Sequence, residues 1–398
     1  MTDRLFKTIL YLYAFFSDFF LVFAVDKLIF KENGLSVTQI AIIISIWGGI
    51  QLLAEIPSGI LADKWNRKYM LVLTGLFFFL CYSTWLVFPS FVGYLIGFSL
   101  FYALGDAFLS GTDQAYIYDY LSTKKQTNDY EKIYGRFKSI RLAGIALAWL
   151  LGGFFSDIFS YNFVIILAII CGFIIFVFGL LLPKVPQVIP IENQNPFSFF
   201  KESFIYAVKH PKIFNIFIWS IIIGSSYRLI DEYWAVYYNW FGFSNTTLGI
   251  LVAISAIVGS AIGMFTYKFK NNLLRNINIL SFVLTAIILL TGTFKSLIII
   301  PFLMLLDPLA HLIGIMSDSL IQHNTPGDRR ATIASTNAFL KNVFLITGLF
   351  FGWIIDLYSV QQGYLFIGLL CLTYFGFAFI LNERQKTHEQ KPATEQLF

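Results

Sequence analysis

Ionisable side chains stand inside long apolar segments of this chain, where a charge is costly and therefore indicates a function. A carboxyl group in apolar surroundings binds a proton more readily than one in water, so it can take up and release protons near neutral pH. The excess of acids over bases also favours a cationic solute. The candidates for binding a proton or a substrate are Asp18, Glu55, Asp106, Asp113, Arg141, Arg228, Asp231, Glu232, Asp307 and His311.

The spacing of these residues suggests which of them act together. Asp106 and Asp113 are seven residues apart, which places them on one face of a continuous helix. Asp307 and His311 are one helical turn apart, and the histidine is either a proton shuttle or a satisfied core residue. We expect Asp106 and Asp113 to bind a proton and a cation alternately, with Asp307 as their counterpart in the second half of the chain.

Structural pairing is the alternative for several of these residues. Arg228 precedes Asp231 and Glu232 by three and four positions, the spacing of an ion pair within one helix. The four aspartates at positions 18, 106, 113 and 307 have no basic residue nearby in the sequence. Arg141 or Lys341 could reach one of them, but not all four.

The composition excludes most soluble functions. The chain has 398 residues, of which 57% are apolar and 13% are charged, whereas an average soluble domain has about 25% charged residues. A soluble protein of this composition could not cover its surface with polar groups. Neither a nucleic-acid-binding protein nor a soluble enzyme fits. The three cysteines are odd in number and suit neither a disulfide framework nor a zinc site. The sequence has no phosphate loop, dinucleotide fingerprint or zinc-protease pair, so we expect no metal and no cofactor.

Twelve apolar segments are long enough to cross a bilayer, which takes about 20 residues per helix. Each must be helical, because lipid cannot satisfy exposed backbone groups. The sequence therefore predicts an all-α membrane protein. The segments cover approximately residues 8–26, 37–62, 69–88, 92–121, 139–157, 162–182, 213–240, 248–267, 277–294, 297–323, 332–357 and 363–381.

Basic residues fix the orientation of these segments. With the N-terminus inside, three of the 28 Lys and Arg residues fall outside and three fall within segments, which leaves 22 on the inner side. This distribution predicts that both termini are cytoplasmic. Asp157 and Asp356 then lie at outer helix ends, where we expect them to be solvated. Asp119 and Asp318 lie near the inner interface, where pairing with loop residues is expected.

The chain divides into two six-helix halves, over residues 1–182 and 212–381. A proline-containing cytoplasmic loop over 183–211 separates them, and a polar cytoplasmic tail covers 382–398. We expect a short amphipathic helix near residues 197–209.

The two halves resemble each other in sequence. Residues 34–45 resemble residues 242–255, and the glycine, serine and threonine at positions 34, 36 and 38 recur 208 positions later. Asp119 and Asp318 match at an offset of 199. Parallel repeats of this kind place a binding site near the middle of the membrane, at the interface of the repeats.

Residues 59–68 carry the most specific motif of the chain, Gly-Ile-Leu-Ala-Asp-Lys-Trp-Asn-Arg-Lys. It resembles the signature loop of the major facilitator superfamily, glycine-x-leucine-alanine-aspartate-basic-x-glycine-arginine-basic. Asn66 replaces the second glycine and is expected to tolerate a left-handed turn. The resemblance implies the major facilitator fold and transport by alternating access. It also implies a cytoplasmic gate, in which Asp63 faces the N-terminus of a neighbouring helix. The gate residues are Gly59, Asp63, Lys64, Arg67 and Lys68.

Two further segments resemble the drug-exporter-like members of this superfamily, namely residues 55–59 and 329–335. The antiporter signature of the fifth span should read glycine-proline-x-x-glycine-glycine. Here Gly152 and Gly153 are present, but Ala148 and Trp149 stand in place of the first glycine and the proline.

We therefore expect a secondary transporter and not an enzyme. The favoured activity is proton-coupled efflux of a hydrophobic or cationic small molecule, as in a multidrug antiporter. Uptake or exchange of a nutrient or metabolite is the alternative within the same fold, and a membrane sensor or assembly subunit is the alternative from another class. We expect a monomer in the bilayer of a bacterial cytoplasmic membrane, with protons as the coupling ion.

Overall fold

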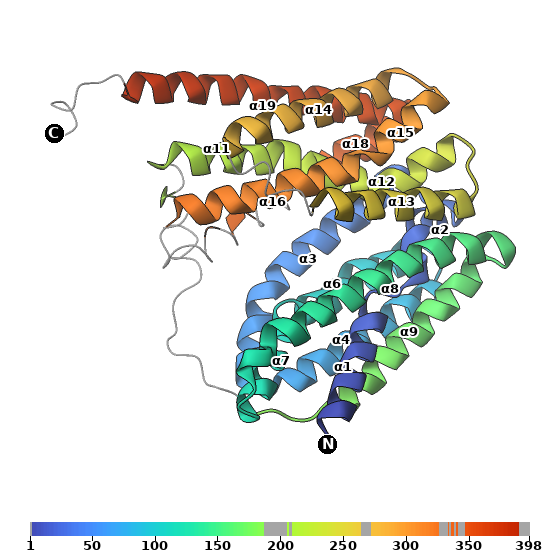
Figure 1. Ribbon diagram of the computed structural model, residues 1–398. Helices are drawn as coiled ribbons and strands as arrows, with labels where there is room; N and C mark the ends of the chain where they lie inside the picture. The colour runs from blue at the N-terminus through green and yellow to red at the C-terminus, as the bar shows by residue number, and fades with distance from the viewer. Residues whose placement is uncertain are drawn as a thin grey trace. The chain divides into compact units, whose positions relative to one another are not determined.

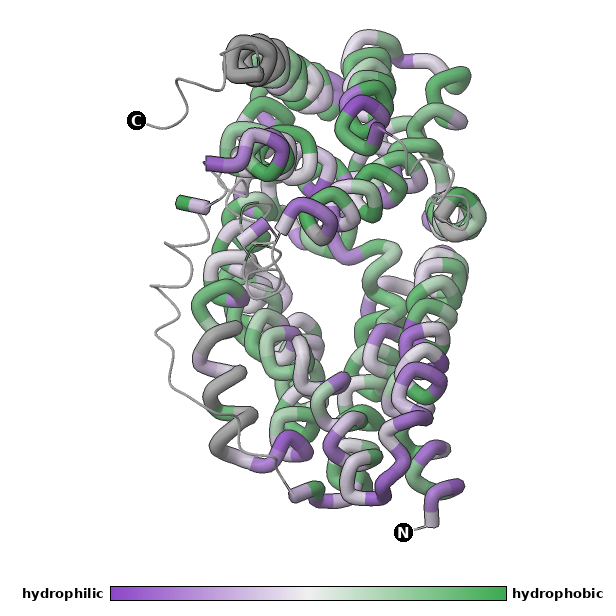
Figure 2. Tube along the Cα trace, turned by 60° about the vertical axis from the view of Figure 1, so that its left-hand side comes forward, coloured by the Kyte–Doolittle hydropathy of each residue, from purple (hydrophilic) through white to green (hydrophobic). Residues whose placement is uncertain are grey.

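A computed structural model describes the protein at residues 2–186, 205–206, 209–263, 272–325, 333, 336–337, 340 and 347–389. Over these residues the chain is helical and has no strand. Ten helices or helix series are long and apolar enough to cross a membrane, and two shorter apolar helices accompany them, at Asn245–Gly259 and Thr347–Leu357. The predicted all-α membrane class is confirmed, and the helices agree with twelve spans. Apolar residues dominate along most of the helices, with hydrophilic residues interspersed (Figure 2).

Contacts along the chain define two compact units. One comprises Met1–Asn193 together with Ala235–Ala253, and the other comprises Gln194–Trp234 together with Ile254–Phe398. Helix α13 (Asn245–Gly263) therefore begins in the first unit and continues in the second. The halves expected from the sequence, with boundaries at 182 and 212, remain a prediction.

The first unit contains the first six predicted spans (Figure 1). Helix α4 packs along α9, and α1 packs against both α8 and α9. Gly75 and Gly172 allow the close approach of α4 and α9, because a Cβ atom at either position would overlap the backbone of the other helix. The elements are α1 (Asp3–Ser17), η1 (Leu21–Ala24), α2 (Asp26–Glu32), α3 (Val37–Lys64), α4 (Arg67–Val87), α5 (Phe91–Tyr94), η2 (Leu95–Tyr102), α6 (Ala103–Leu109), α7 (Thr112–Thr123), η3 (Thr127–Asp129), α8 (Tyr130–Ile158) and α9 (Tyr161–Leu181).

The second unit packs α14 against α16 and α19, and α18 against α19. The predicted helix near residues 197–209 falls almost entirely outside the described residues. The elements of the later part of the chain are α11 (Pro211–Trp219), η4 (Ser220–Gly224), α12 (Ser225–Trp240), α13, α14 (Leu273–Thr293), η6 (Leu297–Ile299), α15 (Ile300–Met304), α16 (Leu306–Asn324), α18 (Thr347–Leu357) and α19 (Val360–Glu389).

The first span is not the continuous helix expected over residues 8–26. Helix α1 ends at Ser17, a short 3-10 helix follows, and α2 begins at Asp26. Asp18 is the C-cap residue of α1, with φ −124°. It therefore lies at the end of a helix and not in the middle of one. At this position its carboxylate can accept hydrogen bonds from another element.

The fourth span is also interrupted, which corrects the placement of two candidate residues. Residues 95–102 are π-helical, and α6 is separated from α7 by Ser110 and Gly111. Gly111 has φ +71°, a left-handed conformation that ends one helix and starts the next. Asp106 and Asp113 thus belong to two different helices, and the expectation of one shared helix face is wrong.

Gly111→Ala is expected to lower the free energy of unfolding by about 1 kcal/mol, because a side chain in the left-handed region is strained. Gly135 is the matched control. A Cβ atom meets nothing within 4 Å at either glycine, but Gly135 is helical. Gly135→Ala should therefore leave stability unchanged or raise it slightly. Thermal unfolding of the purified protein in detergent measures both, and equal stabilities of the two variants would contradict this account.

Candidate functional site

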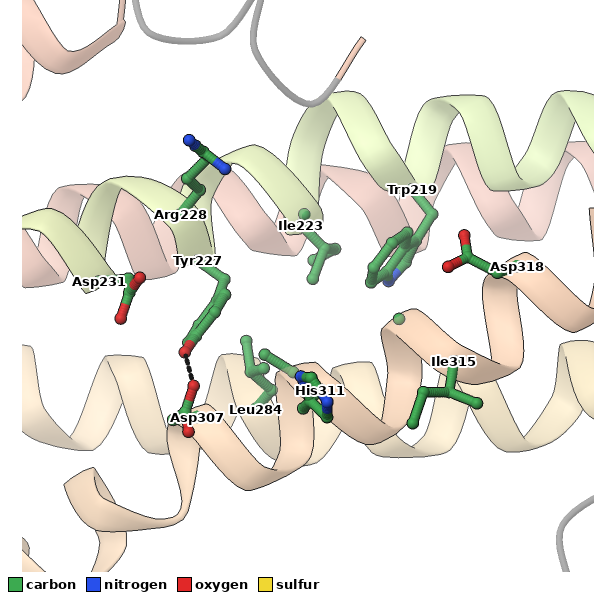
Figure 3. A pocket seen from close by; sticks show the side chains of 13 residues that line it. Trp219, Ile223, Tyr227, Arg228, Asp231, Leu284, Asp307, His311, Ile315 and Asp318 are labelled. Carbon is green, nitrogen blue, oxygen red and sulfur yellow. Dashed lines mark hydrogen bonds between the residues drawn. The ribbon is translucent and has the colours of Figure 1, made fainter. Parts of the chain in front are cut away.

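A pocket of about 430 Å³ lies in the second unit, among α11, α12, α14 and α16 (Figure 3). It brings together four of the candidate residues chosen from the sequence, which come from the seventh and tenth predicted spans. The pocket is lined by Trp219, Ile223, Gly224, Tyr227, Arg228, Asp231, Leu284, Asp307, Ala310, His311, Gly314, Ile315 and Asp318.

Helix α16 supplies one wall of this pocket and its file of titratable groups. Asp307, His311 and Asp318 follow one another at intervals of four and seven residues, so they share one face of the helix. At 1.5 Å per residue, the file extends about 16 Å along the helix axis. His311 and Asp318 are exposed, and Asp307 is half-buried. His311 is therefore not a buried core histidine.

A hydrogen bond closes one end of the pocket. The Tyr227 hydroxyl donates to Oδ1 of Asp307 over 2.7 Å, and the two side chains point toward each other in Figure 3. Five residues of π-helix, Ser220–Gly224, immediately precede α12. Such π-helical turns are frequent at functional sites, because the extra residue per turn shifts the side chains that follow.

Arg228 and Asp231 line the same end of the pocket. The Arg228 side chain extends from α12 on the side away from the Tyr227 phenol (Figure 3). Glu232, which the sequence groups with these two residues, is not among the lining residues. The lining therefore holds three carboxylates and one guanidinium, so with a neutral imidazole it is net negative.

The other end of the pocket has a different character. Trp219 donates from Nε1 to Oγ of Ser281 over 2.8 Å, and this buried hydrogen bond fixes the indole ring. Figure 3 shows Trp219 beside Asp318 and Ile315, with Ile223 and Leu284 toward the middle of the pocket. Aromatic faces attract cations. This end can hold an apolar or aromatic part of a ligand while carboxylates hold a positive charge.

A second group of candidate residues forms a charged cluster in the first unit. Arg141 donates from Nε and Nη2 to the two carboxylate oxygens of Asp18, over 2.7 and 3.0 Å. Its Nη1 donates to Oδ2 of Asp113 over 3.2 Å. Lys138 approaches the same oxygen of Asp113 to 3.4 Å. One guanidinium thus bridges the end of α1 and the start of α7.

This cluster corrects two expectations from the sequence. Arg141 reaches two of the isolated aspartates and not one. It also lies well inside α8, because that helix begins at Tyr130 and not near residue 139. Oδ2 of Asp106 accepts a hydrogen bond from Nε2 of Gln51 on α3.

The signature motif is mostly helical. Residues 59–64 belong to the end of α3, and only Trp65 and Asn66 connect this helix to α4. Asn66 does not adopt a left-handed turn. Its φ is −69°, and its side chain caps α4 by accepting a hydrogen bond from the backbone N–H of Lys68. The same side chain donates from Nδ2 to the Val185 carbonyl, over 2.7 Å. A side-chain amide can form both hydrogen bonds, which accounts for an asparagine at this position.

Two of the five gate residues have side chains that the structure describes. Arg67 forms a buried ion pair with Asp119 of α7. Lys68 donates from Nζ to the carbonyl of Leu180, over 2.7 Å. The side chains of Glu55, Asp63 and Lys64, the surroundings of Gly59 and the whole of Lys341 lie outside the described residues.

Sequence reasoning did not assign Trp219, Gln51 or Lys138 to a site. Asp318, expected to pair with loop residues, lines the pocket and has no hydrogen bond or ion pair with another described residue. The repeat offers the one signal for it, since Asp318 matches Asp119. A proposed convergence of Asp106, Asp113 and Asp307 on one cavity remains a prediction.

Comparison with known proteins gives a consistent family match. The sequence profile of the Major Facilitator Superfamily matches residues 8–348. An uncharacterised MFS-type transporter of Bacillus subtilis strain 168, YxaM, is 22% identical over 233 residues. That match covers 57% of this chain and 56% of the relative, so the chain aligns with little more than half of the relative's length.

Several solved transporter structures share the fold. A mutant of the nucleoside transporter NupG superposes with a TM-score of 0.81 at 16% identity, covering 94% of this chain and 99% of that chain. A bacterial homologue of the human lysosomal transporter Spinster gives 0.73 at 14% identity, with coverages of 95% and 96%. A POT family transporter in complex with a conjugated peptide also gives 0.73, at 13% identity and the same coverages. At such identities the likeness establishes the fold alone.

Proposed function

Because the chain belongs to the Major Facilitator Superfamily, and so is a membrane transporter of a small-molecule substrate, we propose that it exports an organic cation in exchange for protons. The observation that carries this proposal is the pocket of the second unit. There the Asp307 carboxylate is bound by the Tyr227 hydroxyl and accompanied by Asp231 and Asp318.

The charge of the pocket favours exchange over co-transport. A cation is attracted by the net negative lining, and protonation of Asp307 removes part of that negative charge. A proton and a cationic substrate then compete for the same carboxylates, since each neutralises the negative charge that attracts the other. A transporter whose site holds either ligand, but not both, moves them in opposite directions.

The lining also favours a substrate with an apolar part. Ile223, Leu284, Ile315 and the fixed indole of Trp219 offer apolar and aromatic contacts within the same 430 Å³. Most ligand pockets combine such contacts with a few placed polar groups. A hydrophobic cation of modest size meets both requirements.

Further parts of the proposal concern the membrane context. Both termini face the cytoplasm, the protein works as a monomer in a bacterial cytoplasmic membrane, and Asp63 latches the cytoplasmic side in one state of the cycle. The distribution of Lys and Arg supports the orientation. The signature motif supports the latch.

Uptake of a polar nutrient is the second candidate, because the structures that share this fold include a nucleoside transporter. Everted and right-side-out membrane vesicles separate the two. In everted vesicles with an acidic interior, we expect accumulation of the cation tetraphenylphosphonium above that of vesicles without the protein, and its loss when the pH gradient is collapsed. Accumulation of uridine in right-side-out vesicles, without any movement of the cation, would replace export by uptake. Transport of neither probe under a pH gradient would overturn both readings of the pocket.

A further inference from the structure

Two lysines at one end of the first unit take no part in the pocket of the second unit. Lys68 is the second residue of α4, and Lys184 follows the end of α9 by three positions. The end of α9 packs on the start of α4, since a Cβ atom at Gly179 would lie 3.0 Å from Cα of Val72. Both lysines therefore lie at the same end of this helix pair, the end at which the N-terminus also lies (Figure 1).

The backbone on both sides of Lys184 is held by hydrogen bonds. The carbonyl of Pro183 accepts one from the hydroxyl of Tyr116, over 2.7 Å. The carbonyl of Val185 accepts one from Nδ2 of Asn66, also over 2.7 Å. Val185 is buried as well, so this segment packs on the unit and fixes the place from which the Lys184 side chain extends.

Asn66 connects this segment to the other lysine. Its Oδ1 accepts a hydrogen bond from the backbone N–H of Lys68, over 3.1 Å, while its Nδ2 binds the carbonyl of the residue after Lys184. The signature motif has a glycine at this position, and a glycine has no side chain that could form either bond. The asparagine by which this chain departs from the motif thus positions both lysines.

The two ammonium groups retain capacity to bind an anion. Nζ of Lys68 donates to the carbonyl of Leu180 over 2.7 Å, which uses one of its three protons. Nζ of Lys184 lies 5.3 Å from the centre of the Tyr69 ring, an attraction that uses none. In the part of the chain that the structure describes, neither lysine forms an ion pair. Two positive charges without a carboxylate favour an anion beside them.

An exposed apolar face of α9 leads away from these charges. Its residues follow one another at helical intervals of four, three and seven, and they are Ile166, Ile170, Phe173 and Leu180. At 1.5 Å per residue this face extends about 21 Å along the axis, whereas the whole hydrocarbon core of a bilayer is about 30 Å thick. In a membrane-spanning helix such a face contacts acyl chains, so an anion site at its end lies at the level of the lipid headgroups.

We infer that Lys68 and Lys184 bind the phosphate group of an anionic glycerophospholipid, and that Asn66 is the positioning residue of this site. The acyl chains of the lipid lie along the exposed face of α9. Basic residues beside a membrane span attract anionic headgroups, with a gain in affinity of about fivefold for each lysine or arginine. The inference goes beyond the proposed function and uses neither its pocket nor its substrate.

Native mass spectrometry of the purified full-length protein, stripped of lipid in a neutral detergent, measures the binding. Dioleoylphosphatidylglycerol and dioleoylphosphatidylcholine, which have the same acyl chains, are titrated separately. The anionic lipid should bind about 25-fold more tightly than the zwitterionic one, which is the combined contribution of two lysines. Lys68→Gln and Lys184→Gln should each lower the affinity for the anionic lipid about fivefold. Because glutamine retains an N–H donor for the Leu180 carbonyl, the loss in Lys68→Gln reports the missing charge.

Two further variants separate this site from a general effect of charge or stability. Asn66→Gly restores the residue of the motif and keeps both lysines, and it should lower the preference for the anionic lipid by a smaller factor than either lysine substitution. A mere loss of helix stability would leave that preference unchanged. Lys132→Gln combined with Arg136→Gln removes two exposed positive charges from α8 and should leave both affinities unchanged.

Equal affinity of the parent protein for the two lipids would overturn the inference. So would parental affinity for the anionic lipid in the variant that lacks both lysines. If that variant does not fold, Lys184→Gln decides alone, because its side chain is exposed. Glycerol 3-phosphate in excess, compared with ammonium acetate of equal ionic strength, should not displace the anionic lipid. Displacement would assign the site to a soluble phosphate ester and overturn the lipid. None of these measurements uses the transported cation or a pH gradient, so a failure of the proposed export leaves this test intact.

Discussion

Asp307→Asn is expected to lose the response of transport to a pH gradient. The amide cannot take up a proton, and it weakens the charge-assisted hydrogen bond from Tyr227. A hydrogen bond to a charged group contributes about 1.5–3 kcal/mol, so the initial rate of gradient-driven transport should fall roughly tenfold to a hundredfold. Initial rates of tetraphenylphosphonium uptake into everted vesicles, at matched amounts of inserted protein, measure the effect.

Tyr227→Phe is the matched variant for this prediction, because it removes the donor and retains the carboxyl. It should slow transport less than Asp307→Asn and keep its response to the gradient. Binding of the cation to purified Asp307→Asn, measured without a gradient, separates a defect in coupling from a misfolded site. Wild-type gradient-driven transport by Asp307→Asn would remove this residue from the proton pathway and leave Asp231 and Asp318 as the remaining carboxylates of the pocket.

Arg141→Gln is expected to cause the largest loss of stability. The substitution leaves the carboxylates of Asp18 and Asp113 without the guanidinium that bridges them, and Asp113 is buried. Removing one partner of a buried ion pair costs about 3–5 kcal/mol. We expect about 3 kcal/mol, since Lys138 remains near Asp113 and Asp18 is partly hydrated. Thermal unfolding in detergent, with the fraction of inserted protein, measures the loss.

A rescue experiment tests the cause of this effect. Adding Asp18→Asn and Asp113→Asn to Arg141→Gln removes the uncompensated charges, so most of the lost stability should return. Arg136→Gln is the control, because Arg136 lies on the same helix and is exposed. An unchanged unfolding temperature in Arg141→Gln, or no recovery in the triple variant, would show that the cluster is not a structural bridge.

The helices of this protein could be predicted from the sequence because the bilayer leaves little choice. Each apolar segment of sufficient length must satisfy its own backbone groups, so segment length and hydropathy decide the class and the number of spans. The interruptions could not be predicted in this way. One glycine with a positive φ, Gly111, divides the fourth span. Hydropathy averaged over the length of a span does not reveal the conformation of a single residue.

Pairings between distant residues account for the rest of what the sequence did not reveal. Asp18 and Arg141 are separated by 123 positions, and only the packing of α1 against α8 brings them together. The pocket was more accessible to sequence reasoning. Arg228, Asp231, Asp307 and His311 are unusual for their apolar segments and could be selected one by one. Trp219 could not, because an aromatic residue in an apolar span is ordinary.

Asp119 and Asp318, which the sequence predicts to be equivalent positions of two repeats, have different surroundings. Asp119 is buried against Arg67, whereas Asp318 is exposed in the pocket. The aspartate of the first unit is thus part of the scaffold, whereas the aspartate of the second unit is open to a ligand. An engineer who wants to redirect the transporter to another cargo can therefore leave the scaffold position alone. A small mutant library at Ile223, Leu284 and Ile315 would vary the shape of the pocket while keeping its acidic groups.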